Sequence, residues 1–200
     1  MYLTKLMGGY RNSGGSYIQW RDTLSLYHKL LLAFGFALLT GIAAQVRIPL
    51  PFTPVPVTLQ VFMVLLSGTI LGSFFGGASM LIYIISGTAG VPWFNGFAGG
   101  YGVISGITGG YIIGFIPAVM ITGWLTDKYK NFGKVNAQLM LMSLGVFIIY
   151  AFGALHFSFV TRSGFTRTFT MAVLPFIPVD LIKATIAAGI SASFLRKEGF

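Results

Sequence analysis

Two oppositely charged residues lie three positions apart in an apolar stretch near the end of the chain, "PFIPVDLIKATIAAGISASF" from Pro175 to Phe194. This spacing places Asp180 and Lys183 on one face of a helix, with their Cβ atoms roughly 5–6 Å apart. If the stretch spans a membrane, each charge alone costs about 2.5–3.5 kcal/mol at the bilayer centre, so the two are expected to pair inside the protein. A buried ion pair is seldom more stabilising than apolar residues. The pair therefore predicts a binding site for a small molecule, with a purely structural ion pair as the alternative.

Two prolines, Pro175 and Pro178, precede this pair by about one helical turn. Each lacks a backbone N–H and therefore frees a carbonyl near the start of the helix. Those carbonyls would be further acceptors beside Asp180. In the alternative interpretation the prolines occupy the first turn, where proline is tolerated.

Catalysis within the membrane is not expected. The chain has four acidic residues, and Asp22, Asp127 and Glu198 fall in a polar tail, a connecting loop and the C-terminus, so no second carboxylate lies near Asp180. There are no cysteines and only two histidines, too few for a metal site. No phosphate-binding glycine motif occurs. The sequence predicts a recognition site that uses no cofactor and no metal, and not an enzyme.

The composition is that of a membrane protein. Of 200 residues, 55% are hydrophobic and 8% are charged, about a third of the charged fraction of soluble domains. The net charge of +9 is also found in proteins that bind nucleic acid. The basic residues, however, cluster beside apolar stretches, as in loops that meet anionic lipid. We therefore predict a multi-pass protein of the cell membrane that has no nucleic-acid partner.

Apolar stretches long enough to cross a membrane occur six times, after a polar tail formed by residues 1–29. The predicted fold class is an all-α membrane protein, with one six-helix domain over residues 30–200. The second and third helices are joined through Gly72 to Gly77 with almost no loop. The predicted helices are Leu30–Val46, Thr58–Phe75, Gly76–Val91, Tyr101–Leu125, Ala137–Phe159 and Thr170–Leu195.

The distribution of basic residues predicts the orientation of these helices. With six helices, the tail, two of the connections and the C-terminus share one side, which holds nine Lys and Arg residues against three on the other side. Loops rich in Lys and Arg face the cytoplasm, so both termini are expected there. The three outer residues are Arg47, Arg162 and Arg167.

Two connections on the predicted outer side have unusual compositions. The first, "VRIPLPFTPVPVTLQ" from Val46 to Gln60, has four prolines and is expected to be extended and stiff. The second, "GVPWFNGFAGGYG" from Gly90 to Gly102, combines aromatic residues with glycines that permit tight turns. We interpret the loops as the rim and lid of a substrate pocket. The alternative is ordinary loop structure, with Trp93 as an interfacial anchor and with Gln60 and Asn95 as capping residues.

Small residues recur every four positions in the first predicted helix, at Ala33, Ala37 and Gly41. Such a face lets another helix approach closely, which is a common mode of helix association in membranes. The other helix either belongs to this chain or to an outside partner, and the spacing alone leaves both open.

The segments "RIPLPFTPVPVTLQ", "GGYGVISGITGGYIIGF" and "PFIPVDLIK" resemble the BioY family, the biotin-specific substrate-binding subunits of energy-coupling factor (ECF) transporters. The resemblance extends from about Leu30 onward and does not include the tail. It implies a six-helix subunit that holds the vitamin under outer loops. It also implies two kinds of partner, a transmembrane coupling protein (the T component) and two cytoplasmic ATPases. Ala33, Ala37 and Gly41 match the family's docking face for the coupling protein.

The resemblance further implies that Asp180, Lys183 and Asn95 make the polar contacts to biotin. An adjacent acceptor and donor suit the ureido ring, with Asp180 on an N–H, Lys183 on the C=O and Asn95 in support. Lys183 on the carboxylate is the competing assignment. Phe52, Trp93 and Tyr101 are expected to cover the apolar part of the ligand, and Gln60 lies beside them. Arg47, Arg162 and Arg167 are alternative partners for the carboxylate.

The leading functional prediction is thus a high-affinity biotin-binding subunit that works with an ECF coupling module. A stand-alone secondary transporter or facilitator of biotin or a related vitamin, in which Asp180 carries a proton, is the alternative.

Overall fold

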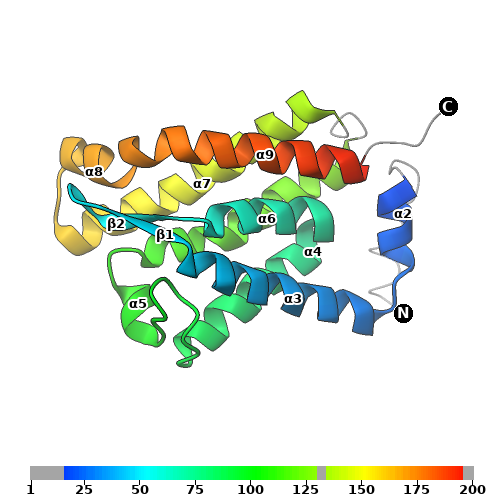
Figure 1. Cartoon of the computed structure of the whole chain (residues 1–200), viewed down its shortest axis with the longest axis horizontal. Coiled ribbons are helices and arrows are strands. Elements are labelled where there is room, and N and C mark those ends of the chain that lie inside the picture. Colours follow the sequence, from blue (N-terminus) through cyan, green and yellow to red (C-terminus); the bar gives the residue numbers. More distant parts are fainter. Residues whose placement is uncertain (1–15, 130–133, 196–200) are drawn as a thin grey trace.

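The computed structural model describes residues 16–129 and 134–195 and is an elongated helical bundle (Figure 1). Its long helices run roughly along one axis because apolar side chains cover their surfaces and pack between them. A two-stranded antiparallel hairpin and several short helices lie at the ends of the bundle. The elements are α2 Ser16–Thr23, α3 Leu26–Gln45, β1 Arg47–Leu50, β2 Thr53–Thr58, α4 Gln60–Thr88, α5 Tyr101–Ser105, α6 Gly109–Lys128, α7 Val135–Thr161, α8 Phe165–Ala172, the 3₁₀ turn η2 Leu174–Phe176, and α9 Ile177–Leu195.

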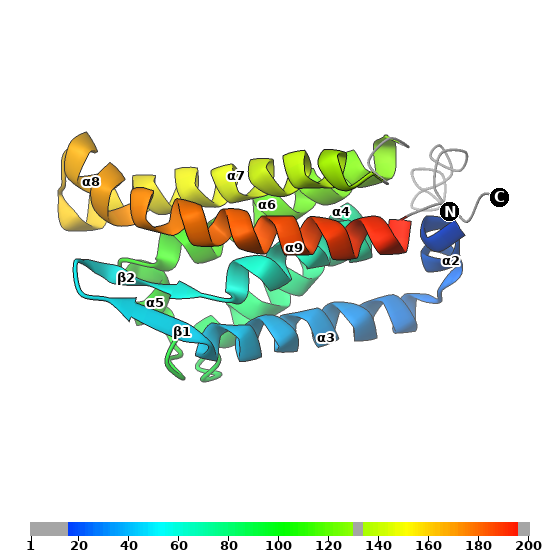
Figure 2. The same cartoon turned by 45° about the horizontal axis from the view of Figure 1, so that its top comes forward.

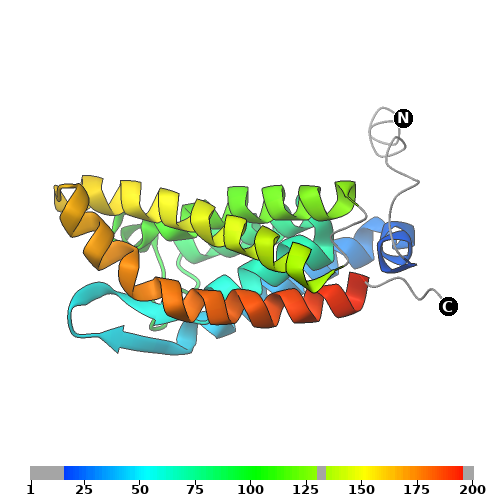
Figure 3. The same ribbon diagram turned by 90° about the horizontal axis from the view of Figure 1, so that it is seen from above.

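The two ends of the bundle differ in structure. One end, called the hairpin end here, carries β1, β2, α5 and α8 (Figure 2). The opposite end, called the terminal end, carries α2 and the last turn of α9 (Figure 3). Tyr17 of α2 and Phe194 of α9 contact each other there, with ring centroids 5.6 Å apart.

Helix α4 is folded back on itself. Gly72, in its middle, has φ 79° and ψ 178°, values that no helix contains. Gln60 and Tyr83 would be about 34 Å apart along a straight helix. Instead, Nε2 of Gln60 donates a 2.7 Å hydrogen bond to the hydroxyl of Tyr83. The predicted join between the second and third helices, from Gly72 to Gly77, therefore coincides with this turn.

Five helices in the described parts of the chain are long and apolar enough to cross a membrane, with α4 counted once. They are α3, α4, α6, α7 and the run of residues 165–195, which contains α8 and α9. The predicted all-helical membrane architecture is confirmed at this level, and the hairpin is an addition to it.

Helices α4 and α6 approach each other closely because glycines line their contact. A Cβ atom built on Gly123 would lie 2.6 Å from the carbonyl oxygen of Gly68, and one on Gly68 would lie 2.9 Å from that of Val119. Any larger residue at either glycine would push the helices apart. This contact fixes the folded-back arms of α4 beside α6.

Several helix boundaries differ from those predicted. Helix α3 begins at Leu26 and not at Leu30, because the Ser25 side chain accepts a hydrogen bond from the backbone N–H of His28 and caps the helix. Helix α2 lies within the segment predicted to be a polar tail. The last predicted helix is broken at Val173, and Pro178 lies in the first turn of α9, where its missing N–H costs little.

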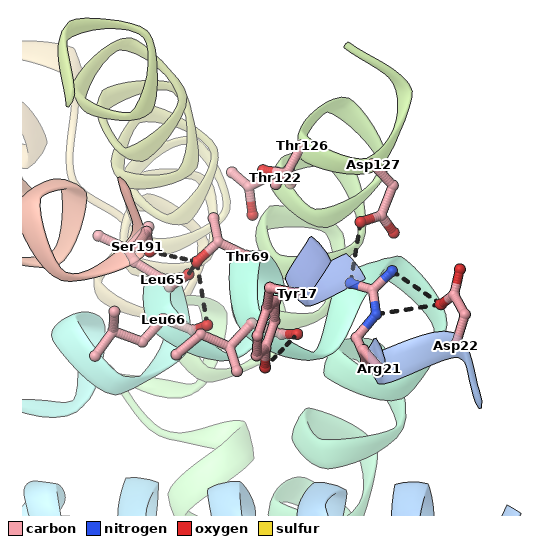
Figure 4. Close-up of polar contacts among 11 residues, drawn as sticks. Tyr17, Arg21, Asp22, Leu65, Leu66, Thr69, Thr122, Thr126, Asp127 and Ser191 are labelled. Carbon is pink, nitrogen blue, oxygen red and sulfur yellow. Dashed lines mark hydrogen bonds and ion pairs between the residues drawn. The ribbon is translucent and has the colours of Figure 1, made fainter. Parts of the chain in front are cut away.

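An ion pair attaches α2 to the end of α6 and lies against the turn of α4 (Figure 4). Arg21 is only 7% exposed, and its Nη1 lies 3.0 Å from Oδ1 of Asp127 at the end of α6. Its Nη2 lies 3.3 Å from Oδ1 of Asp22. A Cβ atom on Gly72 would lie 2.7 Å from both the Arg21 Nη1 and the Asp127 Oδ2 atoms, so the turn is open to the pair only because it is glycine. The Tyr17 hydroxyl donates to the carbonyl of Ile70 on the same turn.

Arg21→Met should therefore destabilise the protein, because it leaves the Asp127 carboxylate largely buried beside Asp22 without a counter-charge. We expect the free energy of unfolding to fall by roughly 1–3 kcal/mol. Thermal unfolding of the purified chain in detergent measures the change. Arg167→Met, at a solvent-exposed position on α8, is the matched control. Equal unfolding temperatures for the two variants would contradict a stabilising role for the pair.

Candidate ligand-binding site

A cavity opens at the hairpin end, and the empty space within its outline, including the part open to solvent, is about 620 Å³. Its wall is formed by β2, the loop between α4 and α5, and side chains from α4, α6, α7 and α9. The lining residues are Val55, Pro56, Val57, Thr58, Gln60, Val61, Asn95, Val103, Thr108, Tyr111, Ile112, Phe115, Ile149, Tyr150, Phe176, Asp180 and Lys183.

The predicted contact between Asp180 and Lys183 is present. The Lys183 ammonium lies 2.7 Å from Oδ1 of Asp180, and the two residues are 8% and 4% exposed. Lys183 also donates a 2.6 Å hydrogen bond to the carbonyl of Thr58, the last residue of β2. The Tyr150 hydroxyl on α7 donates to Oδ2 of Asp180 over 2.6 Å. The pair is thus held from three elements and compensated inside the protein.

These bonds leave capacity for a ligand. An ammonium has three donors, and two of those on Lys183 are used by Asp180 and Thr58. A carboxylate has about four acceptor sites, and two of those on Asp180 are used by Lys183 and Tyr150. The pair can therefore offer one more donor and further acceptors to a molecule in the cavity.

Asn95, in the loop between α4 and α5, adds an unused acceptor to the lining. Its Oδ1 atom is buried and has no hydrogen-bond partner within the described residues. A buried acceptor without a partner costs about 1–3 kcal/mol. A ligand N–H group in the cavity would satisfy it.

Gln60, also predicted as a site residue, lines the cavity but has protein partners on both ends of its amide. Its Oε1 accepts from the Thr58 hydroxyl at 3.0 Å, and its Nε2 donates to Tyr83. Gln60 therefore joins the end of β2 to the second arm of α4. Its main effect on the site is to position Thr58.

The three aromatic residues predicted to cover the ligand are not in the cavity lining. Phe52 is 57% exposed at the turn of the hairpin, and Tyr101 is 71% exposed at the start of α5. Trp93 packs on Tyr83, with ring centroids 5.3 Å apart, and its Nε1 donates to the Tyr83 carbonyl. These aromatics lie outside the cavity lining in this structure, and their contact with a ligand stays a prediction. The apolar wall comes from helical residues, Phe115 and Phe176 among them.

Two tyrosines of the lining were not predicted, Tyr111 on α6 and Tyr150 on α7. The Tyr111 hydroxyl donates to the carbonyl of Ala172, which lies just before the break between α8 and α9. Both tyrosines stand in apolar stretches, so their hydroxyl groups were a signal of polar contacts at membrane depth. Whether the two side chains point into one cavity depends on how α6 and α7 pack, and the residue spacing within each helix does not specify this packing.

The proline-rich segment is extended, as predicted. Strands β1 and β2 pair with Arg47 opposite Thr58 and Ile48 opposite Val57, and the register then shifts so that Leu50 lies opposite Thr53. Pro54 and Pro56 lie on β2, in the stretch where the register shifts. Residues Val55 and Val57 point into the protein core.

Gln45 fastens the second loop to the end of α3. Its Nε2 lies 2.9 Å from the carbonyl oxygen of Gly41, 3.2 Å from that of Trp93 and 3.1 Å from that of Phe94. Its Oε1 accepts from the backbone N–H of Phe97 over 2.9 Å. One side chain therefore sets the path of the loop that carries Asn95.

The small residues of the predicted docking face on the first helix lie inside the fold of this chain. Ala33 and Ala37 are 0% exposed, and Gly41 is buried. A Cβ atom on Gly41 would lie 2.9 Å from the Cβ atom of Trp93. The small residues admit α4 and the second loop of the same chain, which is the internal packing that the spacing had left open.

Gln45→Leu should loosen the loop between α4 and α5, because the four hydrogen bonds of the Gln45 amide to backbone groups, three of them in this loop, are lost at once. We expect faster amide hydrogen exchange over residues 93–98 and a lower unfolding temperature. Gln45→Glu keeps the acceptor for Phe97 and loses the donor, so an intermediate effect is expected. Thr185→Val, which removes an exposed hydroxyl that bonds within α9, is the control. Unchanged exchange in Gln45→Leu would show that the loop holds its path without this residue.

Comparison with known proteins gives one consistent family. A model of the BioY family matches residues 17–199, so the match includes residues 17–29, which the sequence comparison had left outside. The chain is 41% identical over 153 residues to the probable biotin transporter BioY of Pyrococcus horikoshii, with 76% of this chain and 86% of that protein covered. It is 36% identical over 170 residues to the biotin transporter BioY of Thermotoga maritima, with 85% and 97% covered.

A solved structure also resembles this chain over most of its length. It is the crystal structure of the S-component for biotin from an ECF-type ABC transporter, with a TM-score of 0.80 and 25% sequence identity. The similarity covers 89% of this chain and 97% of that one.

Proposed function

This chain belongs to the BioY family, and on that basis we propose that it is the membrane-embedded, biotin-binding subunit of a biotin uptake system. It is a multi-pass protein of the cell membrane that recognises its substrate without changing it chemically. The observation that carries the proposal is the cavity at the hairpin end, in which a buried acid, a buried base and an unpaired amide oxygen meet among apolar walls.

The polar groups of the cavity complement the ureido ring of biotin. This ring presents two N–H donors and one C=O acceptor within a few ångströms. Asp180 and Oδ1 of Asn95 supply acceptors for the two N–H groups, and the remaining N–H of Lys183 supplies a donor for the C=O. The apolar thiophane ring would then lie against the surrounding aromatic and aliphatic residues.

We place six crossings in the membrane: α3, the two arms of α4 on either side of Gly72, α6, α7 and α9. The hairpin end faces outward and the terminal end faces the cytoplasm. The excess of Lys and Arg in the tail, the connection after α6 and the C-terminal segment supports this orientation. In this arrangement the cavity opens toward the side from which biotin arrives.

We propose an ECF coupling module as the partner, consisting of a transmembrane T component and two cytoplasmic ATPases. The similarity to an S-component of an ECF-type ABC transporter supports this partnership. Since Ala33, Ala37 and Gly41 are buried, the surface that meets the T component lies elsewhere than on these residues. Uptake of biotin by cells that lack any coupling ATPase would instead favour a stand-alone transporter.

Biotin titration of the purified chain in detergent tests the function directly. We expect tight binding by the unchanged chain and a loss of roughly tenfold to a hundredfold in Asp180→Asn, because a hydrogen bond to a charged group is replaced by a neutral one. Asp22→Asn, a change at an exposed carboxylate of the terminal end, is the matched control. Absence of biotin binding by the unchanged chain would refute the proposal.

Biotinamide, in which a neutral amide replaces the carboxylate, tests the assignment of Lys183. If this ammonium contacts the ureido C=O, Lys183→Met should weaken biotin and biotinamide by the same factor. Isothermal titration of both ligands gives the two factors. A loss confined to biotin would place Lys183 on the carboxylate and overturn the ureido assignment.

A further inference from the structure

The cavity lining has no net charge to offer a carboxylate. Asp180 and Lys183 are its two charged residues, and they neutralise each other across 2.7 Å. A ligand that carries a carboxylate therefore needs a cation from outside the lining. The following inference rests on the proposed function and assigns that cation.

Arg47 lies where the β1–β2 hairpin meets the loop between α4 and α5. It is the first residue of β1, and its strand partner is Thr58, which lines the cavity. Its guanidinium lies over Gly96, because a Cβ atom built there would be 2.6 Å from Nη1 and 3.3 Å from Nη2 of Arg47. Gly96 directly follows Asn95, which also lines the cavity. Arg47 is thus next to cavity residues of both the hairpin and the second loop.

The environment of Arg47 leaves its charge available. The residue is exposed, and no ion pair to it is found over residues 16–129 and 134–195. Gly96 has φ +74°, so its place against the guanidinium is one where a side chain would be both strained and in collision. An exposed guanidinium that has no ion-pair partner can bind a carboxylate through two parallel hydrogen bonds.

The other two cations predicted on the outer side are less well placed. Arg162 is the left-handed C-cap residue of α7, and Arg167 is on α8. Figure 2 shows α8 at the tip of the hairpin end, whereas β1 begins beside the loop that follows α4. Neither arginine belongs to the cavity lining or is paired in the sheet with a residue that does.

We propose that Arg47 binds the carboxylate of the ligand at the mouth of the cavity. The ureido ring then lies inward on Asp180, Lys183 and Asn95, and the flexible acid chain extends toward the junction of the hairpin and the second loop. Arg47 determines specificity for an acid over its neutral analogues. It contributes through an exposed ion pair, so its effect weakens as salt screens the charges.

Titration of purified Arg47→Gln with biotin and with biotinamide tests this assignment. We expect the unchanged chain to prefer biotin over biotinamide by roughly tenfold, and Arg47→Gln to lose that preference while its affinity for biotinamide stays the same. Retained biotinamide binding also shows that the variant is folded. Arg47→Lys should keep part of the preference, and raising the salt concentration should lower it in the unchanged chain. Arg162→Gln and Arg167→Gln are the matched controls and should keep it fully.

Three results would overturn the assignment. Arg47→Gln could weaken both ligands equally, it could leave the preference unchanged, or Arg162→Gln or Arg167→Gln could abolish the preference instead. Each of these leaves the binding of biotin by the unchanged chain intact, so the proposed function would stand. Failure of the unchanged chain to bind either ligand would overturn both the proposed function and the role of Arg47.

Discussion

A membrane tolerates buried charge only where partners surround it, and the ammonium of Lys183 is where this constraint acts most strongly. It donates hydrogen bonds to the Asp180 carboxylate on its own helix and to the Thr58 carbonyl at the end of β2. The Tyr150 hydroxyl on α7 donates to the second oxygen of the carboxylate. Loss of any of these partners would leave a polar group unsatisfied at low dielectric. The pair therefore fixes the hairpin, α7 and α9 relative to one another, and the cavity is the space that remains between them.

The long helices were predictable from the sequence because the length and hydropathy of a segment are enough to show that it can cross a membrane. Their details were not, because they depend on local caps and on distant contacts. Ser25 starts α3 before the apolar stretch begins, and α2 is stabilised by Asp127, which is remote from it in sequence. The extended hairpin could be predicted since proline excludes helix, but its pairing with a shifted register could not.

The site was predictable where a residue was out of place in its surroundings. Asp180 and Lys183 are expensive in lipid, and Gln60 and Asn95 are polar beside apolar stretches, and all four line the cavity. Aromatic residues carry no such signal, since they suit an interface, a loop and a pocket equally well. Small residues are equally ambiguous, because Ala33 and Ala37 fit an inner face as well as an outer one.

The hairpin has a free edge, and exposed strand edges recruit strands from other molecules. Pro54 and Pro56 on β2 have no N–H to give to an approaching strand, and the register shift beside them bends the edge away from the flat shape that such pairing needs. The prolines that stiffen the hairpin thus also make its edge a poor partner for a strand of a second copy. In a crowded membrane, where chains diffuse in one plane and meet edge to edge, this protects the mouth of the cavity from being sealed by a neighbour.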